Sequence, residues 1–142
     1  MKLSLVDFHC DTLFEMYKRG QPLDSNSLAV SVDKAAAYER YVQVMAIWSD
    51  KKLSDAAAYE EFFKILNNAK EKISTERAVF LDKKISGYGA DSKVKLILAL
   101  EDARILAGDI DRLYRLYEMG LRVLIPVWSG VNCLGGAYDT DK

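Results

Sequence analysis

Apolar and polar residues along the chain form two kinds of segment. Runs rich in β-branched, aromatic and other apolar residues predict buried strands at 3–8, 41–48, 94–100 and 121–128. Between these runs, apolar residues recur every three or four positions, which predicts helices that each present one apolar face. Strands and helices therefore alternate, and this alternation indicates βαβ units with a parallel sheet.

The predicted helices fill the segments between the strands. They cover residues 13–19, 54–72, 76–85 and 110–119. Ser54 is a suitable N-cap for the longest helix, and Gly20 and Gly120 are natural stops for two others. Turns or loops are expected at residues 30–37, 87–89 and 129–142.

Four strands of this kind fit two architectures. Parallel strands are buried on both faces, which agrees with the unbroken apolar runs at 42–48 and 94–100. The strands fit a small open sheet, and they fit equally well half of a (β/α)₈ barrel, which takes about 250 residues. The chain has 142 residues, no internal repeat and no Pro/Gly-rich linker. We therefore expect residues 1–142 to form one domain or one piece of a domain.

The charge pattern excludes several classes of partner. Lys and Arg total 20 and Asp and Glu total 21, with no basic stripe, so no nucleic-acid partner is expected. The apolar runs are too short for a membrane span. Asp7 interrupts the first of them, which argues against a secretory signal and makes the cytoplasm the expected location. We expect Cys10 and Cys133 to be reduced thiols in the interior.

The single histidine lies at the end of the first predicted strand. Residues two apart in an extended segment point to the same side, so His9 and Asp11 can converge on one point. An imidazole nitrogen and a carboxylate oxygen suit zinc or a similar divalent ion. A loop histidine that only hydrogen-bonds fits the same spacing, and from spacing alone it is the commoner outcome.

A carboxylate follows the third predicted strand directly. Glu101 is therefore expected at the carboxyl edge of the sheet, where ligand sites of α/β proteins form, beside His9 and Asp11. The alternative is an acid that stabilises the first turn of the next helix. Asp102 serves that role equally well, which leaves Glu101 available as a metal ligand.

Two further residues are expected near this edge. Trp128 ends the fourth predicted strand, and Asn132 follows it in a glycine-containing loop. An aromatic packed at the edge is the preferred interpretation of Trp128, and a turn role fits Asn132 at least as well as a ligand role. Both are retained as candidate substrate contacts.

In this order, the motifs resemble those of the membrane (renal-type) dipeptidase family, zinc peptidases with a (β/α)₈ barrel. The resemblance rests on the His-x-Asp of residues 6–13, the strand end at 99–103, and the helix, glycine and strand of 113–125 followed by Trp128 and Asn132. It spans nearly the whole chain. It implies an α/β fold that is the N-terminal part, about four β/α units, of a (β/α)₈ TIM barrel of the metal-dependent hydrolase type.

The resemblance also implies a chemistry. His9 and Asp11 would bind one zinc ion and Glu101 would bridge it to a second, so a complete site holds two ions. A metal-bridging water would attack the amide carbon of a dipeptide, often with tolerance for a D-residue at the C-terminal position.

The chain departs from the family pattern in two ways. Many members have Thr-His at the end of the fourth strand, where this chain has Val127 and Trp128, although tryptophan occurs there in some bacterial-type relatives. The family's second-metal histidines, substrate-binding arginine and acid/base aspartate come later in the barrel, and this chain has no second histidine. No catalytic residue is therefore assigned within it.

These departures predict that the 142 residues are an N-terminal portion that is inactive alone. Because a half barrel leaves open sheet edges, we expect it to associate with itself as a homo-oligomer or with the missing half. One alternative function is a phosphoesterase, whose Asp-x-His-x-His motif needs a histidine where Asp11 stands. Another is a non-catalytic α/β remnant that acts by association.

Overall fold

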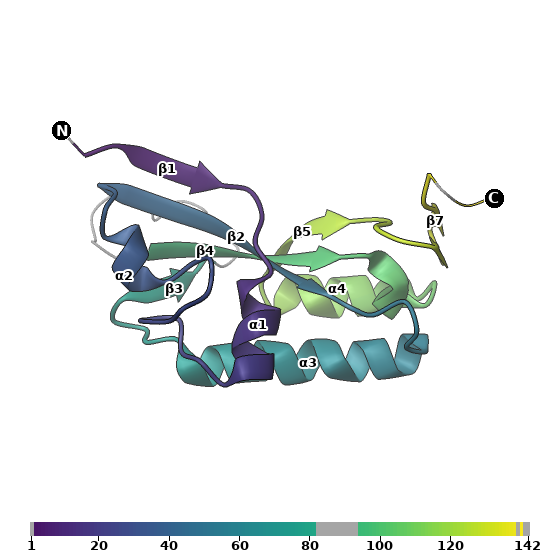
Figure 1. Cartoon of the computed structure of the whole chain (residues 1–142). Helices are drawn as coiled ribbons and strands as arrows, with labels where there is room; N and C mark the ends of the chain where they lie inside the picture. The colour runs from purple at the N-terminus through teal and green to yellow at the C-terminus, as the bar shows by residue number, and fades with distance from the viewer. Residues whose placement is uncertain (1, 82–93, 139, 141–142) are drawn as a thin grey trace.

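The structure is a computed structural model that describes residues 2–81, 94–138 and 140 (Figure 1). Strands and helices alternate along these residues as predicted. In chain order the elements are β1 (Ser4–Asp7), α1 (Thr12–Arg19), α2 (Val32–Ala35), β2 (Arg40–Trp48), α3 (Asp55–Lys72), β3 (Ala78–Phe80), β4 (Val94–Glu101), the 3₁₀ helix η2 (Ala103–Leu106), α4 (Ile110–Glu118), β5 (Leu121–Ile125), β6 (Val131–Asn132) and β7 (Gly135–Gly136).

Strand β4 is the centre of a parallel sheet. It pairs with β2 along one side, and β2 pairs in turn with β1. On its other side, β3 pairs with the first part of β4 (94–96) and β5 with the last part (98–101). Because all these pairings are parallel, the carboxyl ends of β1, β2, β4 and β5 meet at one edge of the sheet.

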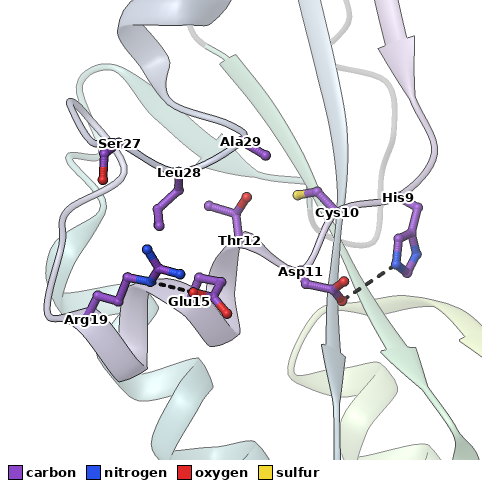
Figure 2. Close-up of a pocket in the computed structure, with 9 residues that line it drawn as sticks. All are labelled: His9, Cys10, Asp11, Thr12, Glu15, Arg19, Ser27, Leu28 and Ala29. Carbon is purple, nitrogen blue, oxygen red and sulfur yellow. Dashed lines mark hydrogen bonds and ion pairs between the residues drawn. The ribbon is translucent and has the colours of Figure 1, made fainter.

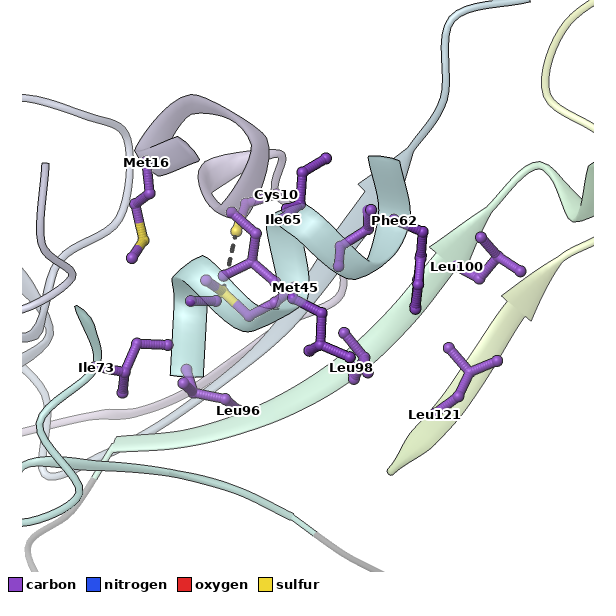
Figure 3. Packing of buried hydrophobic residues seen from close by; sticks show 14 of the residues in the cluster. Cys10, Met16, Met45, Phe62, Ile65, Ile73, Leu96, Leu98, Leu100 and Leu121 are labelled. Carbon is purple, nitrogen blue, oxygen red and sulfur yellow. Dashed lines mark hydrogen bonds between the residues drawn. The ribbon is translucent and has the colours of Figure 1, made fainter. Parts of the chain in front are cut away.

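The main core lies between the sheet and the helices. Alternate residues of β2 and β4 point to this side, among them Met45, Leu96, Leu98 and Leu100, and they are buried with Phe62 of α3 (Figure 3). Helices α1, α3 and α4 all lie on this face (Figure 1). Burial of these large side chains is the main driving force for docking the helices.

The opposite face of the sheet has a smaller cluster. Its buried members are Val44, Ala46 and Ala99, with Ile97 and Val123 packed against them. The described helices contribute their buried residues to the main core, and none of them covers this second face. In a complete (β/α)₈ barrel this face is the interior, which side chains from all the strands fill together.

In three segments the structure has a different type of secondary structure from the one predicted. The helix expected at 76–85 contains strand β3 in its described part, because Val94 N donates to Arg77 O and Leu81 N donates to Leu96 O in a ladder with β4. Residues 82–85 of that prediction, and the loop at 87–89, lie outside the described residues. The turn expected at 30–37 contains α2, capped by Ser31. The loop expected at 129–142 contains the antiparallel pair β6–β7.

The fourth strand is shorter than predicted. It ends at Ile125, three residues before Trp128, because Pro126 has no N–H to donate to a strand ladder. Other expectations hold: Ser54 Oγ accepts a hydrogen bond from Ala57 N (3.3 Å) and caps α3.

The two cysteines differ in environment. Cys10 is buried, with its Sγ 3.4 Å from the Sδ of Met45, and burial raises the pKa of its thiol. Cys133 is exposed between β6 and β7, so the prediction of two interior thiols is wrong for this residue, since a short hairpin has no core of its own. Both cysteines are free thiols. Among the described residues, no helix has the length and apolar character to cross a membrane.

Candidate metal centre

The segment after β1 continues as an extended chain against β2. Cys10 N donates to Val44 O (3.1 Å), and Ala46 N donates to Cys10 O (2.9 Å). Cys10 therefore shares the core side of the sheet with Met45. His9 and Asp11, one position to either side, point the other way.

This geometry brings together the three predicted metal ligands. His9 Nε2 lies 3.6 Å from Asp11 Oδ1 and 3.6 Å from Glu101 Oε2, and one ligand atom of each residue lies within 4.8 Å of the others. Two ligands bound at about 2.1 Å to one tetrahedral ion are about 3.4 Å apart. The two distances from His9 therefore fit coordination of a single divalent cation together with either carboxylate.

The three predicted ligands differ in their exposure. The side chains of His9 and Asp11 are 46% and 49% exposed, whereas that of Glu101 is 13% exposed. Burial raises the pKa of Glu101; the charge of His9 opposes this effect, and those of Asp11 and Asp102 add to it. A divalent cation among these groups would offset the repulsion between the two ligand carboxylates. The donor set of one imidazole and two carboxylates suits zinc.

Aromatic rings lie next to this cluster. Trp48 is in register with Glu101 across β2 and β4. Its ring centroid lies 4.6 Å from that of Phe14 on α1 and 6.1 Å from that of Trp128, which is exposed. Trp48 and Phe14 were not among the predicted site residues. The available signal was that Trp48 ends its strand as Glu101 ends the next strand of the sheet.

The side-chain amide of Asn132 makes hydrogen bonds both to its own loop and to Asp102 after β4. Its Nδ2 donates to Asp102 Oδ1 (2.7 Å) and to Pro126 O (2.8 Å), and its Oδ1 accepts from Leu134 N (2.8 Å). These contacts match the turn interpretation, and a contact of Asn132 with substrate stays a prediction. Asp102 has the capping role expected for it, because its Oδ1 accepts from Arg104 N (3.0 Å) at the start of η2.

A cavity of about 470 Å³ opens beside His9 and Asp11, two of the predicted ligands (Figure 2). Its lining comes from the segment before α1, from α1 itself and from the loop before α2: His9, Cys10, Asp11, Thr12, Glu15, Arg19, Ser27, Leu28 and Ala29. Arg19 Nε lies 2.6 Å from Glu15 Oε2 in this lining. The cavity provides both apolar and charged surface close to two of the predicted ligands.

Comparison with known proteins adds one finding. No protein-family profile and no curated protein matches the chain. A solved structure does match: a metallo peptidase from Rhodobacter sphaeroides liganded with a phosphinate mimic of the dipeptide L-Ala-D-Ala. The TM-score is 0.77 at 16% sequence identity, and the match covers 93% of this chain and 47% of that chain.

The two proteins share a fold. The match confirms the predicted fold class, in which parallel strands alternate with helices as in part of a barrel-like metallopeptidase. The chain spans about half the length of that protein.

Proposed function

We propose that this protein is a metal-dependent peptidase in which His9, Asp11 and Glu101 are metal ligands. The observation that carries the proposal is the convergence of three donor atoms within 4.8 Å at the carboxyl edge of a fold shared with a metallopeptidase. Ligand sites of parallel α/β folds form at this edge, and catalytic sites of (β/α)₈ barrels form at the same end.

Zinc is the metal that best fits the donors. When bound, such an ion polarises an amide carbonyl and lowers the pKa of a bound water. His9 and Asp11 would hold such an ion from one strand end, and Glu101, the most buried of the three, would be shared with a second ion. The ligands of a second site come from outside this chain, which contains one histidine.

Dipeptides are the proposed substrate class. Two observations support it: the sequence resemblance to membrane dipeptidases, and the dipeptide mimic bound by the matching metallopeptidase. Trp48 and Trp128 provide an apolar wall beside the ligands, against which a substrate side chain can pack. Trp128 is the substrate contact proposed with most support, since its ring is exposed.

Activity is proposed to need the remaining part of a barrel. The chain corresponds to 47% of the matching metallopeptidase, and β1 and β5 each pair on one side only among the described strands. We expect the 142-residue chain alone to lack hydrolytic activity and to associate through these edges. Size-exclusion chromatography with light scattering tests the association, and a monodisperse monomer would contradict it.

Metal binding can be tested on the chain itself by calorimetric titration with zinc. We expect weak binding, and at least a tenfold loss of affinity in Glu101→Gln, because the substitution removes the most buried ligand charge. Glu60→Gln, an exposed change on α3, is the matched control and should bind zinc as the wild type does. Equal zinc affinity in Glu101→Gln and the wild type would refute the role of Glu101.

The peptidase activity is tested on a protein that carries the complete barrel. Hydrolysis of a dipeptide should stop when a chelator removes the metal and should return when zinc is added. Hydrolysis that persists in the chelator would refute the proposed chemistry.

A further inference from the structure

The backbone directly after Glu101 has an unusual conformation. Asp102 has φ 73° and ψ 111°, and it is one of two non-glycine residues with positive φ in the described part of the chain. Residues with a Cβ adopt such a conformation rarely, and they keep it where the surrounding structure enforces it. The contacts of Asp102 explain what enforces it.

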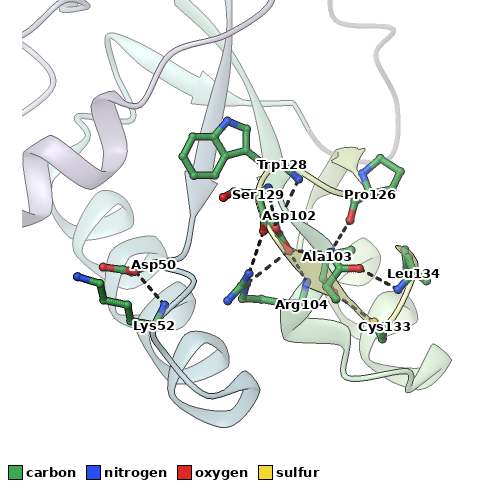
Figure 4. Close-up of polar contacts among 11 residues, drawn as sticks. Asp50, Lys52, Asp102, Ala103, Arg104, Pro126, Trp128, Ser129, Cys133 and Leu134 are labelled. Atoms are coloured by element: carbon green, nitrogen blue, oxygen red, sulfur yellow. Dashed lines mark hydrogen bonds and ion pairs between the residues drawn. The ribbon is translucent and has the colours of Figure 1, made fainter. Parts of the chain in front are cut away.

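Both carboxylate oxygens of Asp102 accept hydrogen bonds (Figure 4). Oδ1 accepts from Asn132 Nδ2 (2.7 Å) and Arg104 N (3.0 Å). Oδ2 accepts from Trp128 N (3.4 Å) and Ser129 N (3.5 Å). The residue is 2% exposed, so the protein itself satisfies this charge.

These contacts replace the strand ladder that Pro126 interrupts. The backbone N–H of Asp102 donates to Ile125 O (3.1 Å), at the last residue of β5. Beyond that point the N–H groups of Trp128 and Ser129 turn to the Asp102 carboxylate. One side chain therefore joins the end of β4, the start of η2 and the loop after β5.

The charge of Asp102 also has a specific partner. Arg104 is 6% exposed, its Nε lies 3.5 Å from Asp102 Oδ1, and its Nη2 donates to Ser129 O (3.4 Å). An asparagine in place of Asp102 would present an NH₂ group to N–H donors and would leave the buried guanidinium without its counter-charge. The position thus requires a carboxylate.

We propose that Asp102 is a positioning residue, which fixes Glu101 at the metal site and holds the Trp128 loop over the carboxyl edge of the sheet. The first part rests on the proposed metal-binding function. The second part concerns the loop alone and can be tested without metal.

The loop can be followed through its tryptophan. The chain has two tryptophans, Trp48 and Trp128, whose ring centroids lie 6.1 Å apart. Such a pair gives an exciton-coupled circular dichroism signal. We expect Asp102→Asn to lose this signal while the helical signal stays. Trp48→Phe identifies the signal as that of the pair.

The matched control is Asp109→Asn. Asp109 also caps a helix, since its Oδ1 accepts from Asp111 N (2.9 Å) at the start of α4. This variant should keep the tryptophan signal and the zinc affinity of the wild type. In Asp102→Asn we expect zinc affinity, measured by calorimetry, to fall about tenfold, as for other residues that orient metal ligands.

The outcomes separate the two proposals. An unchanged tryptophan signal in Asp102→Asn would overturn the positioning role. A wild-type chain that binds no zinc, with a tryptophan signal that depends on Asp102, would overturn the metal proposal and support the positioning of the loop. If Asp102→Asn does not fold, Asn132→Ala is the second variant, because it removes one donor and keeps the carboxylate. It should weaken the tryptophan signal, and an unchanged signal would again overturn the role.

Discussion

The two faces of the parallel sheet use different side chains from the same strands. On the helix-covered face, β4 contributes Leu96, Leu98 and Leu100, all buried in the main core. On the opposite face it contributes Ile97 and Ala99, within a much smaller cluster. Neighbouring residues of one strand therefore belong to two separate hydrophobic clusters, and the helix-covered cluster is the larger within the described chain.

The largest expected effect is on the helix-covered face. Leu98→Ala removes a buried side chain from the main core and should lower the free energy of unfolding by about 2–5 kcal/mol, from lost burial and the cavity left behind. Urea unfolding followed by far-UV circular dichroism measures this change. A loss below that range would mean that the core collapses around the site.

The neighbouring residue provides the matched comparison. Ile97→Ala changes a side chain of the same size on the opposite face, where it is only partly buried. We expect a loss of about 1–2 kcal/mol in the same urea experiment. Equal losses for the two variants would show that the two faces contribute alike to stability. In a protein with the complete barrel, Ile97→Ala should cost more than in this chain, because the second face would then be fully packed.

The sequence predicted the long strands β2 and β4 well, and it predicted the short strand β3 and the end of β5 poorly. Long apolar runs identified β2 and β4 because buried parallel strands need no polar face. The prediction failed for β3, where three residues are too few for a periodic pattern and pairing with β4 decides the conformation. It also failed for the end of β5, because an apolar run that contains Pro126 continues past the last ladder hydrogen bond.

In the candidate site, too, local sequence patterns were predictable and contacts between residues far apart in the sequence were not. His9, Asp11 and Glu101 were predictable because alternation along a strand and position at a strand end are both visible in sequence. Apart from the helix cap, the contacts of Asp102 were not, since they depend on a positive φ and on donors 26 to 30 residues away. Spacing within a motif therefore predicts which side chains converge at the sheet edge, whereas the contacts that surround Asp102 come from residues far away in the sequence.

A smaller effect is expected at the start of α3, the longest helix on the covered face. Ser54→Ala removes the hydrogen bond to Ala57 N and should lower the free energy of unfolding by about 1 kcal/mol. Ser54→Asp should keep stability near that of the wild type, because aspartate also accepts this bond. A thermal-unfolding series distinguishes the two, and equal losses would argue against the cap.

The smallest effect is expected for an exposed ion pair at the edge of this face. Arg77 Nη2 lies 2.7 Å from Asp33 Oδ1, and hydrogen bonds from Arg77 and then Ser25 lower the pKa of Asp33 from its ordinary value of 3.8. The contribution to stability is therefore present above that value and is lost as the pH falls through the lower pKa of the folded state.

Thermal midpoints of the wild type and Arg77→Gln measure this contribution. We expect a small difference near neutral pH, which shrinks in high salt and vanishes in strong acid. A difference that persists in strong acid would show that Arg77 acts through packing.

The contrast between the two cysteines has a practical consequence. Thiol reagents attack the thiolate, and burial both shields Cys10 and raises its pKa. Cys133 is exposed, and its Sγ lies 3.7 Å from Ala103 O, just past the carboxyl end of β4. A maleimide dye should therefore label the native sequence at one site, beside the loop that carries Trp128, and report on ligand arrival without any engineered cysteine.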